Sequence, residues 1–442
     1  MAAAVPSQLQ GRRVVVVGMA RSGVAAAQVA RDAGARVLCT DRRPEAPRVA
    51  GTEAVYGEHR REDFLSADLV IVSPGVPARQ ADVAAVLGAG VPVVGELGFA
   101  ASRLAGLPIL AVSGTNGKST CTHLLGQLLV QAGYRTFVGG NLGVPLSEAV
   151  AQRAALDVAA VEVSSYQMEL PGAFSPFAGV ILNLSPDHLE RHGSLESYGE
   201  HKCRLFHRMG AENAAIIPGS DRRLDDLSRY LPGTRLYLGG SPGVKWTRDA
   251  LILDAGPDPG MLDLRGFRLP GEHNRANLAA AVLLATWFGA RRDALSPALL
   301  EGLSHRLQPV GEKHGILYIN DSKATNVDAT LVALAAMERP TVLLLGGRAK
   351  ERSPWNQLLL PLTKARAVVA FGEAGPQISD QLRAGGQDVV DAADLPRALL
   401  AGRALARPGD AVLLSPACAS FDAFTDFEHR GRAFAALVSE LE

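Results

Sequence analysis

The stretch from Pro108 to Gly133 constrains the fold of this chain more than any other segment. It consists of an apolar strand, a glycine loop and an amphipathic helix, in that order. Because Gly114 and Gly117 have no side chains, the backbone N–H groups of the loop can point toward phosphate oxygens. The N-terminus of the helix adds its positive dipole. Lys118 supplies a compact positive charge at the same place. The segment therefore predicts a nucleotide-phosphate site on the loop.

The loop is a variant of the Walker sequence, because its spacing is GxxGKST rather than GxxxxGK[ST]. A plain turn with a surface lysine is the alternative, but strand, loop and helix occur in the order that phosphate binding requires. Ser119 or Thr120 can bind Mg²⁺ through its hydroxyl. The residues predicted to contact ATP here are Gly114, Thr115, Asn116, Gly117, Lys118, Ser119 and Thr120.

Short apolar runs rich in Val, Ile and Leu alternate with Ala-rich helical stretches along the chain, which predicts an α/β protein with parallel sheets. Its 442 residues exceed what one core usually serves, so we expect three domains, at 1–98, 99–303 and 304–442. Residues 211–270 are rich in Gly, Pro and Asp and predict no clear elements. Strands are expected at 14–17, 69–72, 109–112, 158–161, 180–182, 316–319, 342–345, 368–371 and 411–414.

Charge and cysteine usage limit the partners and the compartment. Lys plus Arg and Asp plus Glu each number 45, so we expect no nucleic-acid partner and no binding to an anionic membrane. No apolar run approaches the roughly 18 residues of a membrane span, and no basic segment precedes the first apolar stretch. We expect a cytoplasmic protein, since its cysteines show neither disulfide nor metal spacing: Cys39, Cys121, Cys203 and Cys418.

A second glycine turn lies near the start of the chain. A strand ends at Gly18, a helix follows, and the next strand ends just before Asp41, roughly 20 residues later, as in a dinucleotide-binding unit. Ala20 replaces the middle glycine of GxGxxG, which hinders close approach to a pyrophosphate. Either a nucleotide-sugar site or an empty tight turn is possible, and a further turn at Ser73 favours the site. Candidate residues are Ala20, Arg21, Ser22, Gly23, Asp41, Arg42, Ser73 and Gly75.

Residues of the type that binds metals follow two other strands. Glu162 ends one strand, and Asp187 and His188 follow the next. Because parallel strands deliver their carboxyl ends to one edge, we expect these side chains to join the phosphate loop in a Mg²⁺ and ATP site. In the following helix, Tyr198 and Lys202 are four residues apart and share one face.

Seven motifs occur in the order seen in Mur ligases: TNGKST, EVSSYQ, NLSPDHLERH, YGEHKCRLF, GEHNRAN, NDSKATN and SPACASFDAFTDFEHRG. The resemblance covers essentially the whole chain. It implies a Rossmann-like N-terminal domain, a central P-loop ATPase-like domain with a parallel sheet, and a Rossmann-like C-terminal domain. It also implies a monomeric, ATP-dependent amide ligase of peptidoglycan precursor synthesis that forms an acyl phosphate. The last two motifs are most similar to those of members that add D-glutamate to UDP-N-acetylmuramoyl-L-alanine.

The resemblance also implies roles for individual residues. Lys118, Glu162, His188 and Lys202 would be catalytic. Lys202 would be carbamylated by CO₂ and would complete two Mg²⁺ sites with Glu162, His188 and Ser119 or Thr120. The remaining contacts would be Asn141 and Ser164 for the UDP substrate, Asn274, Asn277, Arg306, Asp321 and Lys323 for ATP, and Thr325, Lys350, Ser420, Phe421 and Phe427 for D-glutamate.

Several alternatives remain open at this point. Arg348 stands where an acid is more typical of the family, and Lys202 could be an unmodified lysine that contacts phosphate. His188 could position either a metal or the acyl phosphate. Other readings of the whole chain are a related amide ligase acting on folate or on a different peptide residue, a nicotinamide oxidoreductase suggested by the first glycine turn, and a nucleotide-binding scaffold without catalysis.

Overall fold

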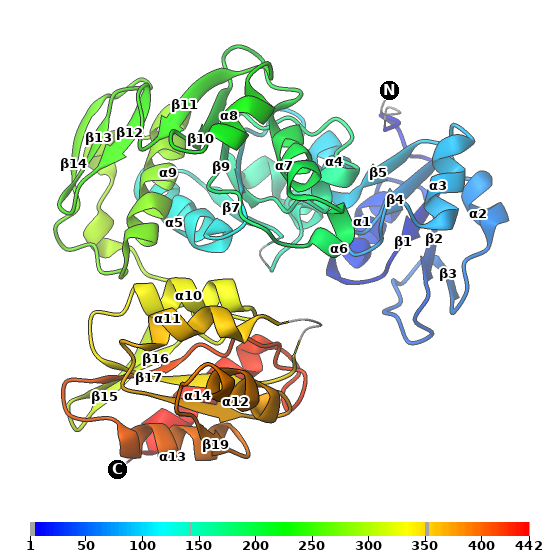
Figure 1. Cartoon of the computed structure of the whole chain (residues 1–442). Helices are drawn as coiled ribbons and strands as arrows, with labels where there is room; N and C mark the ends of the chain where they lie inside the picture. Colours follow the sequence, from blue (N-terminus) through cyan, green and yellow to red (C-terminus); the bar gives the residue numbers. More distant parts are fainter. Residues whose placement is uncertain (1–4, 142, 350–352, 442) are drawn as a thin grey trace. The chain divides into compact units, whose positions relative to one another are not determined.

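The computed structural model describes residues 5–141, 143–349 and 353–441 (Figure 1). The chain divides into two compact units. Unit 1 comprises Met1–Phe267 and His273–Leu300, and unit 2 comprises Arg268–Glu272 and Glu301–Glu442. Unit 1 holds two β-sheets and unit 2 holds one. In the described parts of the chain, no helix is long and apolar enough to cross a membrane.

The first sheet of unit 1 is fully parallel, with the strand order β3-β2-β1-β4-β5. Helices α1 and α4 cover one face and α2 and α3 the other, which is the doubly wound arrangement expected for the N-terminal domain. Its elements are β1 (Arg13–Val17), α1 (Arg21–Asp32), β2 (Arg36–Asp41), β3 (Glu53–Tyr56), α2 (Arg61–Leu65), β4 (Leu69–Val72), α3 (Ala81–Gly88), β5 (Val93–Gly95) and α4 (Glu96–Arg103).

The second sheet of unit 1 has nine strands in the order β14-β13-β12-β11-β10-β9-β6-β8-β7. Its parallel core places β6 between β8 and β9, so the loops after these three strands meet at one edge. The elements leading to this edge are β6 (Ile109–Ser113), α5 (Lys118–Gln131), β7 (Thr136–Gly140), η1 (Leu146–Ala155), β8 (Val158–Glu162), η2 (Gln167–Glu169), β9 (Ala178–Ile181), α6 (Leu189–His192), α7 (Leu195–Cys203) and η3 (Arg204–Phe206).

Residues 211–270, whose pattern predicts no clear elements, extend this sheet. The strands are β10 (Ala214–Pro218), β11 (Thr234–Leu238), β12 (Gly243–Trp246), β13 (Ala250–Leu253) and β14 (Gly260–Asp263), with α8 (Arg222–Ser228) between the first two. β13 and β14 pair antiparallel. Strands of four or five residues between Gly, Pro and Asp turns carry too little periodicity to be recognised from sequence. Unit 1 ends with α9 (Glu272–Phe288), η4 (Arg292–Ala294) and η5 (Pro297–Leu299).

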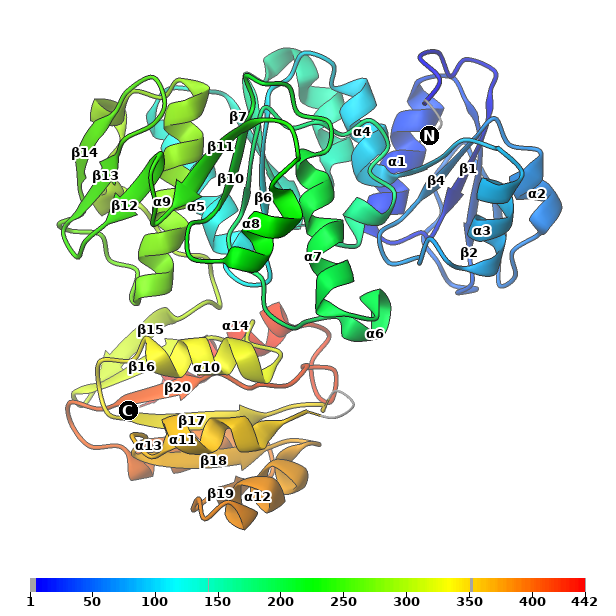
Figure 2. The same cartoon turned by 45° about the horizontal axis from the view of Figure 1, so that its top comes forward.

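Unit 2 is built on a six-stranded sheet in the order β15-β16-β20-β17-β18-β19, parallel except for the edge strand β15. Helices α10, α11 and α12 cover one face, and α13 and α14 the other (Figure 2). The elements are β15 (Gln308–Lys313), β16 (Ile316–Asn320), α10 (Val327–Ala335), β17 (Thr341–Gly346), η6 (Trp355–Leu358), α11 (Leu359–Leu362), β18 (Ala367–Phe371), α12 (Gly375–Ala384), β19 (Val390–Ala392), α13 (Leu395–Leu405), β20 (Ala411–Leu414) and α14 (Phe427–Glu440).

Every strand expected from the apolar runs is present, with its ends within two residues of the expected ones. Their Val, Ile and Leu side chains are buried, except for the partly buried Leu317, because helices cover both faces of each parallel sheet. The α/β class and the parallel sheets are therefore confirmed.

Candidate active site

The phosphate loop joins β6 to α5 in unit 1. Gly114 (φ +143°) and Gly117 (φ +84°) have backbone angles that favour glycine, which explains why both are needed in this turn. The Lys118 ammonium folds back over the loop and donates to the carbonyl oxygens of Gly114 at 2.9 Å and Thr115 at 2.7 Å. The loop thus holds a cation at the start of a 14-residue helix, the arrangement expected for a phosphate site.

Asn183, just after β9, fixes the shape of this loop. Its side-chain oxygen accepts the N–H groups of Thr115 at 3.1 Å and Asn116 at 2.8 Å, and its amide donates to the Asn116 carbonyl at 3.0 Å. Those two N–H groups therefore face Asn183. The motif NLSPDH contains this residue, but its role depends on β9 lying beside β6, which the local sequence does not reveal.

Lys202 lies beneath the phosphate loop and is only 1% exposed. Its Nζ donates to the Gly114 carbonyl at 2.7 Å and lies 4.3 Å from the centroid of the Tyr198 ring, so the expected shared helix face is confirmed. Burial and the nearby Lys118 charge lower the pKa of Lys202 well below its ordinary value, although Asp187 and Glu162 act in the opposite direction. A buried lysine of this kind has a larger neutral fraction than an exposed one.

Glu162 ends β8 and is 2% exposed. One carboxylate oxygen accepts the Asn141 amide at 2.7 Å, whereas the other is buried with no hydrogen-bond partner among the described residues. A buried carboxylate oxygen without a partner is unfavourable unless a cation or a donor reaches it. Glu162 therefore has the chemistry of a metal ligand.

His188 directly precedes α6 and has a left-handed backbone (φ 52°). Its Nδ1 lies 2.8 Å from the Tyr166 hydroxyl, and its Nε2 lies 3.4 Å from the Asp187 carboxylate. Among the residues that the structure describes, no group of three or more His, Cys, Asp or Glu side chains could hold a metal ion. A magnesium site at this edge would therefore need other ligands, such as the buried hydroxyls of Ser119 and Thr120 on the first turn of α5.

Asn274 and Asn277 lie in the first turns of α9 and are buried. A Cβ atom built on Gly117 would lie only 2.3 Å from the Asn277 side-chain oxygen. Asn277 therefore packs directly against the phosphate loop.

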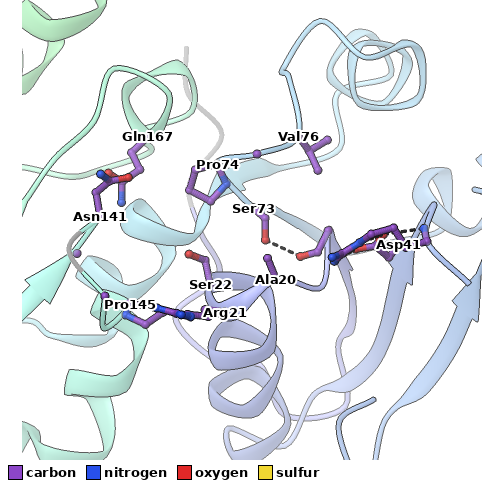
Figure 3. Close-up of a pocket in the computed structure, with 15 residues that line it drawn as sticks. Ala20, Arg21, Ser22, Asp41, Ser73, Pro74, Val76, Asn141, Pro145 and Gln167 are labelled. Carbon is purple, nitrogen blue, oxygen red and sulfur yellow. Dashed lines mark hydrogen bonds and ion pairs between the residues drawn. The ribbon is translucent and has the colours of Figure 1, made fainter. Parts of the chain in front are cut away.

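A cavity of about 630 Å³ opens beside the first sheet, between the glycine turn at Gly18 and residues of the second sheet (Figure 3). Seven of the expected substrate residues line it: Ala20, Arg21, Ser22, Asp41, Ser73, Gly75 and Asn141. Gln167 and Arg43 also line it and had not been recognised from the sequence. Figure 3 shows Asn141 and Gln167 across the cavity from Ser22 at the start of α1.

Three expected substrate residues are absent from the cavity lining. The Gly23 backbone packs on the glycine turn, since a Cβ there would lie 1.9 Å from the Gly18 carbonyl oxygen. Arg42 is exposed, and its neighbour Arg43 lines the cavity instead. The Ser164 hydroxyl donates to the Gln167 side chain at 2.9 Å.

Asp41 holds the glycine turn and Arg43 together. Its carboxylate accepts the Met19 N–H at 2.7 Å and pairs with the Arg43 guanidinium at 2.9 Å. The Arg43 hydrogen bond is the main reason that the pKa of Asp41 falls to about 2. Asp41 therefore remains ionised and keeps Arg43 at the rim of the cavity.

Unit 2 places its expected site residues around the ends of β16 and β20. Burial raises the pKa of Asp321 to about 7, although the Ser415 hydroxyl donates to its carboxylate at 2.8 Å. Lys323 Nζ lies 4.9 Å from the centroid of the Phe427 ring. The other expected residues here are Arg306 and Thr325, both half-buried, Ser420, which is buried, and Phe421, which is exposed. Lys350 lies outside the described residues.

Arg430 of α14 is fully buried and braces three turns of unit 2. Its guanidinium donates to the Ser322 hydroxyl and carbonyl, to the Gly346 carbonyl after β17, and to the Cys418 and Ala419 carbonyls after β20. Arg348 pairs with Glu373 at 3.0 Å, so this departure from the family pattern is matched by a nearby acid.

A phosphate loop, a buried lysine beneath it and a carboxylate with an unpaired oxygen, on an α/β fold of three sheets, define a nucleotide-dependent enzyme. Three family models match the chain: "Mur ligase MurD-like, N-terminal domain" at residues 12–95, "Mur ligase middle domain" at 112–285 and "Mur ligase, glutamate ligase domain" at 305–418. Together with the full-length relatives described next, these matches show that the chain belongs to the Mur ligase family and is a ligase.

The relatives match over nearly their whole length. The chain is 41% identical to the UDP-N-acetylmuramoylalanine--D-glutamate ligase of Anaeromyxobacter dehalogenans, over 98% of both chains. It is 37% identical to the ligase of the same name from Pelotomaculum thermopropionicum, again over 98% of both. The family resemblance drawn from the seven motifs is thereby confirmed, and the oxidoreductase and scaffold readings are wrong.

Solved structures support the fold. The MurF ligase of Thermotoga maritima, in complex with ADP, matches with a TM-score of 0.60 at 17% identity, over 98% of this chain and 97% of that one. At this identity the likeness concerns the fold alone. The three-domain α/β architecture is confirmed, whereas the domain bounds and the assignments of individual site residues remain predictions.

Proposed function

We propose that this chain joins the amino group of D-glutamate to the carboxylate of UDP-N-acetylmuramoyl-L-alanine, with conversion of ATP to ADP and phosphate. Relatives of the same name match over 98% of the chain. The observation that carries the proposed chemistry is the buried Lys202 within 2.7 Å of the phosphate loop carbonyl of Gly114.

The reaction has to overcome the poor reactivity of a carboxylate toward an amine. An oxygen of the L-alanine carboxylate attacks the γ-phosphorus of ATP, and the bond from that phosphorus to ADP breaks, which gives an acyl phosphate. The D-glutamate amine then attacks the carbonyl carbon, and the tetrahedral intermediate expels phosphate as the amine loses a proton. Lys118 offsets negative charge on the transferred phosphoryl group, because its ammonium already lies over the loop.

We further propose that two Mg²⁺ sites would be formed by Glu162, His188, a hydroxyl of Ser119 or Thr120, and a carbamylated Lys202. The unpaired Glu162 oxygen supports this set. The lowered pKa of Lys202 supports the carbamate, because the neutral amine is the form that attacks CO₂ and then loses a proton. When bound, the metal neutralises phosphate charge.

We assign the UDP substrate to the cavity beside the first sheet, because its volume and its polar rim suit a nucleotide sugar. ATP contacts are assigned to the phosphate loop with Asn274 and Asn277, and also to Arg306, Asp321 and Lys323 of unit 2. D-Glutamate is assigned to Thr325, Ser420, Phe421 and Phe427. Four free cysteines, all buried, and the use of ATP support a reaction in the cytoplasm.

The test is ADP release and amide formation by the full chain with UDP-N-acetylmuramoyl-L-alanine, ATP and one amino acid at a time. D-Glutamate should support turnover, whereas L-lysine and diaminopimelate should not. Lys118→Ala should lower kcat by at least about a hundredfold, since it removes a charge aimed at the transferred phosphoryl group.

Lys245→Ala is the matched control, because Lys245 is an exposed lysine on β12, and its kcat should stay within about twofold of the unsubstituted chain. Amide formation without nucleotide, or full activity of Lys118→Ala, would contradict the proposed function.

A further inference from the structure

Arg191 and Glu169 form a largely buried ion pair beside the loop after β4, which lines the cavity assigned to the substrate. Arg191 Nε lies 2.6 Å from Glu169 Oε1 and Arg191 Nη2 lies 3.0 Å from Oε2, so the contact is bidentate. Each side chain is only 11% exposed. Burial raises the pKa of Glu169, but the Arg191 hydrogen bonds and a backbone N–H lower it by more, so the carboxylate is ionised. Such a fork fixes both side chains in one orientation.

Both members of the pair also reach the loop that follows β4. Glu169 Oε2 accepts the Ala78 N–H at 3.0 Å, and Arg191 Nη2 lies 3.4 Å from the carbonyl oxygens of Pro74 and Val76. Pro74 and Val76 line the cavity assigned to the UDP substrate. A ligand that orders this loop therefore orders backbone atoms that are hydrogen-bonded to Arg191 and Glu169.

On its other side the pair contacts the surroundings of His188. The Arg191 guanidinium lies 4.6 Å from the centroid of the Tyr166 ring, and the Tyr166 hydroxyl lies 2.8 Å from His188 Nδ1. The Arg191 N–H also donates to the His188 carbonyl at 3.0 Å. Direct contacts thus run without a gap from the cavity loop to His188.

We propose that Arg191 and Glu169 are positioning residues that couple loading of the substrate cavity to the orientation of His188. This inference rests on the proposed function, since it takes the cavity as the UDP-substrate site and His188 as part of the reacting site. Neither residue touches the reacting atoms. The planar guanidinium is essential to the coupling, because one side chain has to meet a carboxylate, two carbonyls and an aromatic ring at the same time.

The test is steady-state kinetics of the full chain carrying Arg191→Lys, Glu169→Gln or both. Each single substitution should lower kcat by about tenfold to a hundredfold, the usual effect of removing a residue that orients a catalytic group. KM for ATP should stay within about twofold, because the phosphate loop is untouched. The double variant should be no slower than the slower single variant, since both changes remove one shared interaction.

Arg135 and Asp157 provide the matched control. They form another bidentate pair in unit 1, with contacts of 3.0 and 2.6 Å, at the opposite ends of β7 and β8 from the site. Arg135→Lys and Asp157→Asn should leave kcat within about twofold. Thermal unfolding of every variant separates a loss of folding from a loss of rate.

A further variant leaves the Arg191–Glu169 pair itself intact. Tyr166→Phe removes only the hydroxyl that contacts His188, and it should lower kcat while leaving KM for the UDP substrate unchanged. Binding of UDP-N-acetylmuramoyl-L-alanine should shift the His188 Cε1–Hε1 NMR signal in the unsubstituted chain but not in Arg191→Lys.

Two results would overturn the coupling while the unsubstituted chain remains active: normal kcat in the Arg191, Glu169 and Tyr166 variants, or a normal His188 response in Arg191→Lys. If the unsubstituted chain fails to join D-glutamate to its UDP substrate, the proposed function itself is wrong.

Discussion

At the scale of single residues, Lys202 departs most from ordinary lysine chemistry. Exposed lysines are protonated at neutral pH, whereas burial and the neighbouring Lys118 lower the pKa of this one. Its hydrogen bond to the Gly114 carbonyl also fixes where the amine lies. The side chain is therefore positioned at the phosphate loop with a larger neutral fraction than an exposed lysine has, which is what the proposed carbamylation requires.

Lys202 should carry a carbamate when the protein is kept in bicarbonate. Incubation with ¹³C-bicarbonate should give a carbamate carbon signal that Lys202→Ala lacks and Lys245→Ala retains. Since a lowered pKa leaves more of the amine neutral at a given pH, the signal at a fixed concentration of dissolved CO₂ should persist at a lower pH than for an exposed lysine such as Lys245. Equal signals in Lys202→Ala and the unsubstituted chain would contradict the modification.

Sequence motifs could predict which residue types gather at the site, but not which of two neighbours faces it. Asp41 was recognised as a cavity residue, yet Arg43 rather than Arg42 lines the cavity. Alternate residues near a strand end point in opposite directions, and the local turn decides which one points inward. Asn183, Gln167, Glu169 and Arg191 were missed for a related reason, because their roles arise from contacts with distant segments.

At the scale of elements, the unit of strand, glycine loop and helix was predictable because all of its signals lie within one short stretch of sequence. Its contact with α9 was not, since Asn277 approaches the loop from a helix more than a hundred residues later. Gly117 therefore serves two purposes. It adopts a left-handed angle, and it leaves room for the Asn277 side chain.

Gly117→Ala should raise KM for ATP by tenfold or more, on the order of the effect of misplacing a group that positions the substrate. It should also destabilise the chain by about 1–3 kcal/mol in chemical unfolding, through backbone strain and the clash with Asn277. Gly133→Ala, just beyond the other end of α5, is the control. It has a similar φ of +89° but nothing within 4 Å of an added Cβ. An unchanged KM for ATP in Gly117→Ala would show that the loop tolerates a side chain.

The strands that extend the second sheet could not be predicted from the hydrophobic pattern of the sequence. Long apolar strands such as those in the parallel cores were recognised, because helices bury both of their faces. In β13 and β14, buried and exposed residues alternate over only four positions, between turn-forming residues. Their pairing is fixed by the neighbouring strands rather than by any signal that can be read within the segment.

At the scale of the whole molecule, the described residues that line the cavity proposed for the UDP substrate all belong to unit 1. A ligand that binds only the folded protein stabilises the part that forms its site against unfolding. The gain is about 2.7 kcal/mol when the ligand is at a hundred times its Kd. In the full chain, UDP-N-acetylmuramoyl-L-alanine should therefore slow hydrogen exchange in β1 and β4 and leave β17 and β20 unchanged. Equal slowing in both units, measured by mass spectrometry, would contradict a site confined to unit 1.

In unit 2, the buried Arg430 connects three turns that are far apart in the sequence. One guanidinium ties the turns after β16, β17 and β20 to each other through backbone and hydroxyl oxygens. The described parts of these turns, at Ser322, Gly346, Cys418 and Ala419, are thus held in place by hydrogen bonds within the fold, before any substrate arrives. The entropy of arranging them is lost once, when the chain is made, and not again in each catalytic cycle.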